Sequence, residues 1–359
     1  MIVYIVLAIL VWLLKLVLLD CYNDSKKFLI ISFICITIVL GFRGNSVGVD
    51  TYAYSVLFDR AKDMTWSDIF ASFPRVVYMF DQYGFPQTVE CFYVAYCKIV
   101  ALLFGNFQWS LIITAIIISI GFGKFIYENC DNVFLGVYVF LCESIFINSF
   151  NLQRQIMAMA IVTFALPYIR EKRMLKAGVI IMVASLFHNT MLLCMLLIPV
   201  YYVKNKRHFL KIQAIITVAF PVLVPVMIKI VSAILPRYAA YFSMTNNSSA
   251  RGIWVLWLFE FIIIILSYFR LEINKYSFYI YFGALLYFGF ELLGLSASYL
   301  SRVSLTFAPS LILLFDRGMY LFEIRSRKIY CSALYLLLTM FYLSYVLRGS
   351  AMSYTFFWQ

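Results

Sequence analysis

Three arginines, Arg43, Arg154 and Arg302, each stand at one end of a long apolar run. A guanidinium group presents a planar fork of donors that binds phosphate or carboxylate through two parallel hydrogen bonds, which a lysine ammonium cannot do. An arginine left facing hydrocarbon costs at least a few kcal/mol, so each of these needs an anionic partner. We therefore expect the three side chains to contact phosphate.

Two further residues are candidates for moving a proton. Asp50 follows Arg43 by seven residues, in the turn GVDTY. It suits the N-cap of a helix, and it also suits a carboxylate that accepts a hydrogen bond from a sugar hydroxyl or acts as a base. His188 is the histidine that lies within an apolar stretch. A packed core residue, a general base and a phosphate ligand all remain open for it.

The segment NLQRQ places Gln155 beside Arg154 at the start of an apolar run, so both side chains are expected to point into the bundle. Arg154 then requires a partner, which is either a protein carboxylate such as Glu143 or Glu291, or a substrate anion. Glu90 and Arg237 are further possible site residues.

The composition requires lipid as the solvent. The 359 residues are 64% hydrophobic and 13% charged, whereas about a quarter of the residues are charged in a soluble domain. The apolar runs do not alternate as barrel strands would, so they predict an all-α, polytopic membrane helix bundle. The net charge of +12 is explained by cytoplasmic loops rich in Lys and Arg, and no nucleic acid partner is expected.

Some chemistries lack their sequence signatures. The eight cysteines form no CxxC pair, and the chain has no Walker motif, no HExxH and no Asp-rich pair. We therefore expect no metal site, no cofactor and no ATP-driven transport of the P-loop kind. A lipid-diphosphate donor needs no metal where arginines neutralise the leaving group.

About ten full crossings are expected in one polytopic domain that covers residues 1–359. Their predicted ranges are 2–19, 28–42, 108–126, 133–150, 153–169, 212–235, 253–269, 277–298, 301–315 and 329–347. The run 89–105 contains Glu90 and Lys98, so we expect it to insert only partly. Residues 43–88, which lie between the predicted span 28–42 and the run 89–105, form a long extracytoplasmic loop. In this loop TWSDIFASF (65–73) predicts an interfacial helix with a capping box.

Residues 177–203 are flanked by basic loops on both sides and are too short for two full crossings. A re-entrant hairpin satisfies both conditions, with arms of ~12 residues that each climb ~18 Å. Its tip would lie at His188-Asn189. Exposed backbone at that depth requires a neighbouring protein surface or a water-filled cavity, so the hairpin predicts a cavity.

The basic clusters set the orientation. With Lys26-Lys27, REKRMLK (170–176), KNKRHFLK (204–211) and EIRSRK (323–328) in the cytoplasm, both termini lie outside. The outer face then collects mostly arginines: Arg43, Arg60, Arg75, Arg154, Arg237, Arg251, Arg302 and Arg348. Retention of positive charge does not explain cations on that side. We expect Arg60, Arg75, Arg251 and Arg348 to be interfacial anchors or partners of loop carboxylates.

Several motifs resemble the EpsG/Wzy-type polymerases of bacterial O-antigen and capsular polysaccharide. The motifs are FRGNSVGVDTYAYSVLF (42–58), NLQRQIMAMAI (151–161), ASLFHNTMLL (184–193) and, more weakly, SRVSLTF (301–307). The segment VECFYVAY (89–96) is similar to the corresponding family region but lacks a proline after Glu90. The resemblance rests on the order and spacing of these motifs.

The resemblance implies a glycosyltransferase of the bacterial cytoplasmic (inner) membrane, with its active site facing the outside. Such proteins join oligosaccharide repeat units carried on undecaprenyl diphosphate, and a chain-length regulator protein is a possible partner. Carried over to this chain, Arg154, Arg302 and Gln155 would bind the donor diphosphate and Arg43 the donor or acceptor diphosphate. His188 or Asp50 would take the proton of the acceptor hydroxyl.

Three other functions use a similar set of residues. A flippase for the same lipid-linked sugars would need cations in a cavity, but it is expected to show repeated halves and access from both faces. A WaaL-like polysaccharide ligase would share the chemistry and differ in the acceptor. An acyltransferase would use the single buried histidine as its reactive centre.

Overall fold

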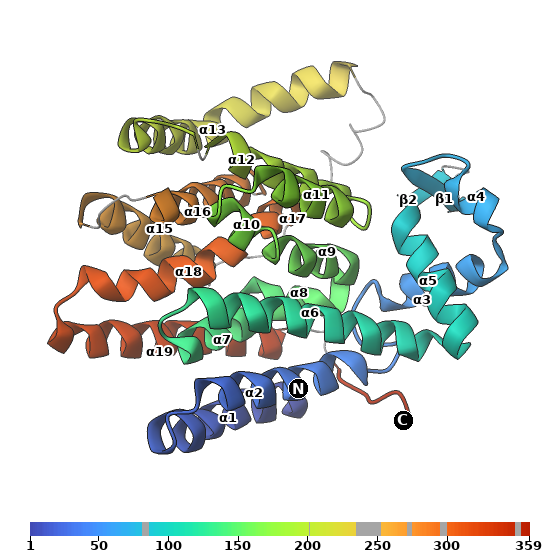
Figure 1. Cartoon of the computed structure of the whole chain (residues 1–359), viewed down its shortest axis with the longest axis horizontal. Helices are drawn as coiled ribbons and strands as arrows, with labels where there is room; N and C mark the ends of the chain where they lie inside the picture. The colour runs from blue at the N-terminus through green and yellow to red at the C-terminus, as the bar shows by residue number, and fades with distance from the viewer. Residues whose placement is uncertain (81–85, 201, 235–252, 271–274, 295–299, 349–352) are drawn as a thin grey trace. The chain divides into compact units, whose positions relative to one another are not determined.

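The computed structural model describes residues 1–80, 86–200, 202–234, 253–270, 275–294, 300–348 and 353–359. Within these ranges the chain is predominantly α-helical, as predicted (Figure 1). The predicted site residue Arg237 and the predicted anchor Arg251 lie outside the described residues.

The helices and strands follow one another in chain order. Their bounds are α1 Ile2–Leu14, α2 Ser25–Gly41, α3 Thr51–Asp63, α4 Trp66–Phe70, β1 Arg75–Phe80, β2 Pro86–Glu90, α5 Cys91–Phe104, α6 Phe107–Asn129, α7 Val133–Cys142, α8 Ser144–Asn151, α9 Gln153–Thr163, α10 Leu166–Arg170, α11 Met174–Ser185, α12 Leu197–Val200, α13 Lys206–Ile234, α15 Ile253–Arg270, α16 Lys275–Gly294, α17 Leu300–Ser304, α18 Pro309–Gly318 and α19 Ile324–Arg348. A π-helical segment, Lys15–Cys21, extends α1, and short 3-10 helices occupy Asn189–Leu196, Leu305–Phe307 and Met319–Leu321.

By length and composition, three helices of the described chain can cross a membrane: Ile2–Cys21, Phe107–Asn129 and Ile324–Leu347. They coincide with the predicted spans 2–19, 108–126 and 329–347. The pair α7 and α8 would make a fourth, although it bends by 44° at Glu143. The protein is therefore a helical membrane protein, and the larger number of ten crossings stays a prediction.

Two predicted spans are interrupted by helix ends. In 153–169, α9 ends at Thr163 and α10 begins at Leu166. In 301–315, a 3-10 turn separates α17 from α18, and α18 begins at Pro309. Proline lacks the N–H that a helix interior needs, so it favours the first position of a new helix. Apolar composition alone did not locate these breaks.

The predicted loop 43–88 contains more structure than expected. The capping box is present, because Thr65 accepts from the Asp68 N–H at 3.2 Å and Asp68 accepts from the Thr65 N–H at 2.9 Å. The helix ends at Phe70, so Phe73 does not share its face. An antiparallel hairpin of β1 and β2 then pairs Arg75 with Glu90, and no strand had been predicted there.

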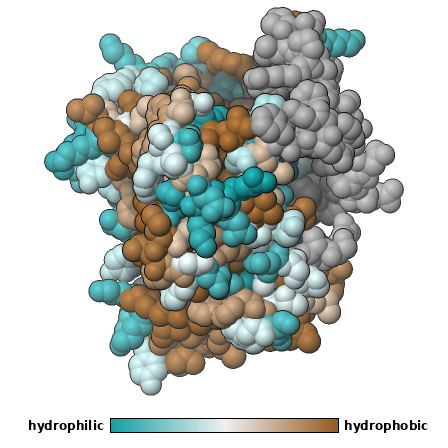
Figure 2. Space-filling view, turned by 90° about the vertical axis from the view of Figure 1, so that its right-hand side faces the viewer, coloured by the Kyte–Doolittle hydropathy of each residue, from teal (hydrophilic) through white to brown (hydrophobic). Residues whose placement is uncertain are grey.

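The chain divides into two compact units. Unit 1 contains Met1–Asn129, Ile145–Met195 and Tyr345–Gln359, and unit 2 contains Cys130–Ser144 and Leu196–Ser344. Within unit 1, α3, α4, α5 and the hairpin lie together on one side (Figure 1). That side carries a hydrophilic patch bordered by hydrophobic residues (Figure 2).

His188 lies at a break in the segment 177–203. Helix α11 ends at Ser185, and a 3-10 helix begins at Asn189. The His188 N–H still donates to the Ala184 carbonyl at 3.1 Å, which closes the last turn of the first arm. The α-helix thus ends at the residues predicted for the hairpin tip, and both the re-entrant hairpin and its insertion into a membrane stay predictions.

Candidate functional site

The centre of the candidate site is an ion pair between Arg154 and Glu90. Arg154 opens α9, and Glu90 stands at the junction of β2 and α5. Their Nη1 and Oε2 atoms are 2.5 Å apart, with side-chain exposures of 18% and 3%. The sequence analysis offered a protein carboxylate such as Glu143 or Glu291, or a substrate anion, as the partner of Arg154; the carboxylate that pairs with it is Glu90. These two residues are 64 positions apart in the sequence, and α5, α6, α7 and α8 lie between them.

Burial raises the pKa of Glu90, but the positive charge of Arg154, together with smaller contributions from neighbouring groups, outweighs burial and leaves that pKa below its ordinary value. Glu90 is therefore ionised at neutral pH. Its second oxygen, Oε1, accepts from the Asn189 N–H at 3.3 Å. The carboxylate thus connects α9 with the break that contains His188, and it holds the guanidinium in one orientation.

Aromatic rings surround the rest of the Arg154 side chain. Its Cζ lies 5.9 Å from the ring centre of Tyr54 and 5.6 Å from that of Tyr93. Such cation–π contacts stabilise a desolvated cation without neutralising it. The Nε of Arg154 is buried and has no hydrogen-bond partner among the described residues. Arg154 therefore retains a donor that its protein neighbours do not use.

Arg43 belongs to the same network through Gln153. Its Nη2 donates to Gln153 Oε1 at 2.9 Å, and its Nη1 donates to the Ser149 carbonyl at 3.2 Å. Gln153 Nε2 in turn donates to the hydroxyl of Tyr93 at 2.7 Å. Arg43 is 2% exposed and lies 5.1 Å from the Phe150 ring centre. No carboxylate bonds to it among the described residues, so its charge is balanced by carbonyl and ring dipoles.

Asp50 occupies the predicted N-cap position of α3, but its side chain makes no capping hydrogen bond. Its charge acts on Tyr54 and Tyr78, two tyrosines on which the charge of Arg154 also acts. The capping role proposed from sequence is absent, and the carboxylate remains a candidate for binding a polar group.

The remaining predicted residues fall into two groups. Gln155 is buried in unit 1, one residue from Arg154. Glu143, Glu291 and Arg302 belong to unit 2. There, Glu143 accepts from Tyr287 at 2.9 Å and from the Ser144 hydroxyl, and Glu291 accepts from the Ser304 hydroxyl. Each of these carboxyls is occupied by hydroxyl donors of its own unit.

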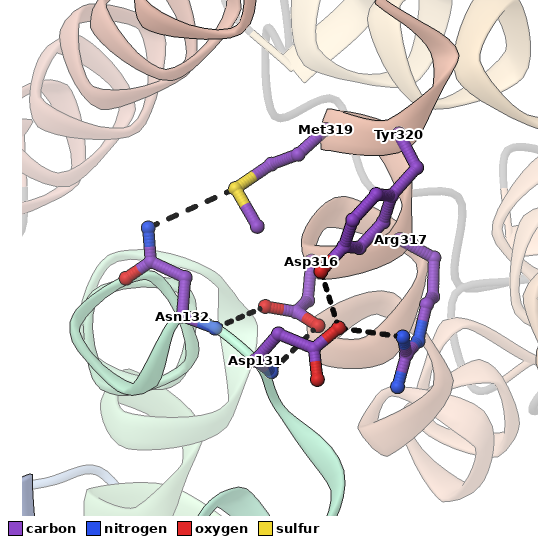
Figure 3. A network of polar contacts seen from close by, with 6 residues as sticks. All are labelled: Asp131, Asn132, Asp316, Arg317, Met319 and Tyr320. Carbon is purple, nitrogen blue, oxygen red and sulfur yellow. Dashed lines mark hydrogen bonds and ion pairs between the residues drawn. The ribbon is translucent and has the colours of Figure 1, made fainter. Parts of the chain in front are cut away.

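Unit 2 has a second polar network, which sequence reasoning did not predict (Figure 3). Asp316 is fully buried and accepts from the N–H groups of Asp131 and Asn132 at 3.0 and 2.8 Å. Asp131 pairs with Arg317 Nη1 at 2.6 Å and accepts from the Tyr320 hydroxyl at 2.6 Å. This network joins the turn before α7 to the end of α18.

Glu90, Tyr54 and Tyr93 are the site residues whose roles the sequence did not reveal. Glu90 was a possible site residue without a role, and the tyrosines resembled ordinary interfacial aromatics. Tyr93 does lie three residues after Glu90, which is one turn of α5. That spacing was the available signal, because it places both side chains on one side of the helix start.

The fold and site together define a class: a helical membrane protein with a buried arginine–carboxylate–tyrosine cluster in one unit. The model of the EpsG family matches residues 26–358, and the chain belongs to the EpsG family. This is a family of membrane proteins in polysaccharide biosynthesis, with polymerase-like glycosyl transfer as its suggested activity. Neither the curated proteins nor the solved structures contain a match.

Proposed function

We propose that the chain is a polysaccharide polymerase that joins undecaprenyl-diphosphate-linked oligosaccharide repeat units at the outer face of the bacterial cytoplasmic membrane. In the reaction, the bond between the anomeric carbon of the growing chain and its phosphate oxygen breaks. A hydroxyl oxygen of the incoming unit forms the new glycosidic bond. The hydroxyl proton passes to a protein base, and undecaprenyl diphosphate leaves with its negative charge.

The environment of Arg154 is the observation that carries this proposal. Glycosyl transfer from a diphosphate needs a cation that stabilises the negative charge that develops on the leaving oxygen. Arg154 is held by a single carboxylate contact, stands between two tyrosine rings and keeps an unused buried donor. A guanidinium fixed in this way can bind a phosphate oxygen without losing its orientation.

The other residues take roles around this cation. Glu90 orients Arg154 and ties it to the backbone of Asn189. His188 or Asp50 takes the acceptor proton, and Arg43 adds a second buried positive charge through Gln153 and Tyr93. Gln155 would contact the donor diphosphate, and a phosphate contact of Arg302, which belongs to unit 2, stays a prediction from the sequence. These steps use side chains alone, so the proposed reaction is independent of metal ions.

The test is glycan extension by the purified protein in nanodiscs supplied with lipid-linked repeat units. We expect a ladder of longer glycans without ATP and in the presence of EDTA. Loss of the ladder in EDTA would contradict metal independence. Movement of labelled lipid-linked units across the bilayer without longer products would instead support a flippase. Transfer to a lipid core acceptor alone would support a ligase, and transfer of an acyl group would support an acyltransferase.

A further inference from the structure

The last described segment, SYTFFWQ (353–359), pairs with the backbone around Arg43. The Gly44 N–H donates to the Thr355 carbonyl at 2.8 Å, and the Phe357 N–H donates to the Phe42 carbonyl at 3.0 Å. These two bonds make an antiparallel bridge between Arg43 and Phe356. Figure 1 shows this end of the chain beside the end of α2. Nothing in the sequence pattern had predicted that residues more than 300 positions apart would pair.

Side chains reinforce the bridge on both sides. The Tyr354 hydroxyl donates to the Val39 carbonyl at 2.9 Å, in the last turn of α2. The hydroxyls of Ser46 and Thr355 are 3.2 Å apart. The Phe356 and Trp358 rings stack at 4.5 Å with an interplanar angle of 9°. The segment is thus fixed against α2 and the following turn by main-chain and side-chain bonds together.

The segment also helps to enclose the Arg43 side chain. The ring of Tyr354 packs edge-on against Tyr4 at 5.8 Å, and the guanidinium interacts electrostatically with both phenols. A buried cation without a carboxylate depends on fixed dipoles, because no mobile water can reorient around it. Tyr354 supplies part of that fixed surrounding, and the bridge fixes the Arg43 backbone.

Gly44 allows this close approach. A Cβ added to Gly44 would stand 2.8 Å from Thr355 Oγ1 and 3.5 Å from the Phe356 carbonyl oxygen. The first distance is shorter than real Cβ contacts tolerate, so a side chain at residue 44 would push the segment away. A smaller residue at 355 would restore the space.

We propose that the main chain of Thr355 and Phe357 and the side chain of Tyr354 position Arg43 at the angle its phosphate contact requires. This inference rests on the proposed function, since it assigns the segment to the same diphosphate site. The segment itself touches no reacting atom. Its effect on catalysis therefore passes through Arg43, and removing Arg43 must also remove the effect of the segment.

A space-compensation series tests this. We expect Gly44→Ala to lower kcat/KM for glycan extension about tenfold, because misplacing a binding group is costly even without deleting it. In the double variant Gly44→Ala/Thr355→Ala, kcat/KM for glycan extension should return to within about threefold of the wild-type value. Thr355→Ala alone is the matched control. If kcat/KM of the folded double variant Gly44→Ala/Thr355→Ala stayed as low as that of the folded Gly44→Ala variant, the inference would be overturned.

A double-variant cycle gives the second test. Arg43→Ala and deletion of residues 353–359 should each reduce kcat/KM about 100-fold, and the combined variant should be no worse than either. If the fold-losses in kcat/KM of the two single variants multiplied in the combined variant, the segment would act independently of Arg43, and the inference would be overturned.

Trypsin cleavage after Arg43 supplies a readout that does not use activity. Protection of this bond is expected in the wild type and in the compensated pair, with exposure in the deletion and in Gly44→Ala. A wild type that is protected yet forms no ladder would refute the proposed function and leave the pairing in place. Cleavage of the wild type at the rate of the deletion would refute the positioning role itself.

Discussion

Units 1 and 2 both bury carboxyl groups among apolar helices, but they give them different partners. In unit 1, Glu90 is 3% exposed and pairs with a guanidinium. In unit 2, Glu143 is equally buried, and among the described residues it accepts hydrogen bonds from the hydroxyls of Tyr287 and Ser144. Glu260 is fully buried, and neither carboxyl oxygen has a partner among the described residues. Buried charge pairs thus mark the candidate site, whereas buried acids alone do not.

A second comparison, between two arginine–carboxylate pairs, separates the effect of burial from the effect of the chemical groups. Arg317 and Asp131 in unit 2 approach to 2.6 Å, almost the same distance as Arg154 and Glu90. Their side chains are 30% and 45% exposed, however, and solvent screens the attraction. The same pair of groups is therefore a surface contact in unit 2 and a desolvated, oriented cation in unit 1. Four predictions follow from this difference, ordered by the size of the expected effect.

Replacing the arginine of each ion pair, Arg154 in unit 1 and Arg317 in unit 2, should give the largest difference in activity. Arg154→Ala should reduce kcat/KM for glycan extension by a factor of about 100 to 1,000, the usual loss for one charge-stabilising donor. Arg154→Lys should restore little, because an ammonium lacks the guanidinium fork. Arg317→Ala is the matched control and should extend glycans within about threefold of the wild type. Equal losses in both alanine variants would show that the contrast between the units has no catalytic meaning.

Neutralising the carboxylate tests orientation. Glu90→Gln keeps the shape of the side chain and removes its charge, so Arg154 is present but loses its partner. We expect kcat/KM to fall about 10- to 100-fold, with folding judged by size-exclusion chromatography and thermal unfolding. Retention of full activity would assign Glu90 a passive structural role.

The pH dependence follows from the lowered pKa of Glu90. A carboxyl whose folded pKa lies below its unfolded value contributes stability above the unfolded value and loses it as the pH falls through the folded one. Unfolding temperature should therefore be insensitive to this group near neutral pH and should fall only below its ordinary value of 4.5. Glu90→Gln should lack that acidic decrease. An unchanged profile in the variant would show that another group causes it.

The smallest effect is expected at the exposed Asp131–Arg317 ion pair, on the free energy of unfolding. Asp131→Asn removes the charge that faces Arg317 and weakens its hydrogen bond with Tyr320. Exposed ion pairs contribute about 0–1 kcal/mol, so denaturant unfolding should change by no more than that amount. Glycan extension should not change. A larger loss would mean that this network contributes more than its exposure indicates.

The sequence analysis chose Arg43, Asp50, Arg154 and His188 as candidates, and all four belong to unit 1, but their roles stay predictions. The carboxylate partner of Arg154 was not predicted. The Arg154–Glu90 pair joins residues that are 64 positions apart and separated by α5, α6, α7 and α8, and local periodicity contains no such information.

The same reasoning explains the features that were missed. The bend at Glu143 and the break before Pro309 each lie within a stretch that is apolar on average, so hydropathy summed over a window did not reveal them. The pairing of Phe356 with Arg43 joins segments that are distant in sequence, and a seven-residue aromatic segment resembles an interfacial anchor. Composition therefore predicted the class of fold, while long-range contacts determined the site.

A double replacement tests the central claim most directly. In the variant Glu90→Gln/Arg154→Gln, two amides replace the ion pair, which removes both buried charges at once and is expected to preserve the fold. Glycan extension from lipid-linked repeat units is then measured beside the wild type in the same nanodiscs. We predict a folded protein that forms no ladder, because the cation that meets the diphosphate is gone. A ladder of wild-type length and rate would contradict the account, since it would show that the pair only holds the helices together.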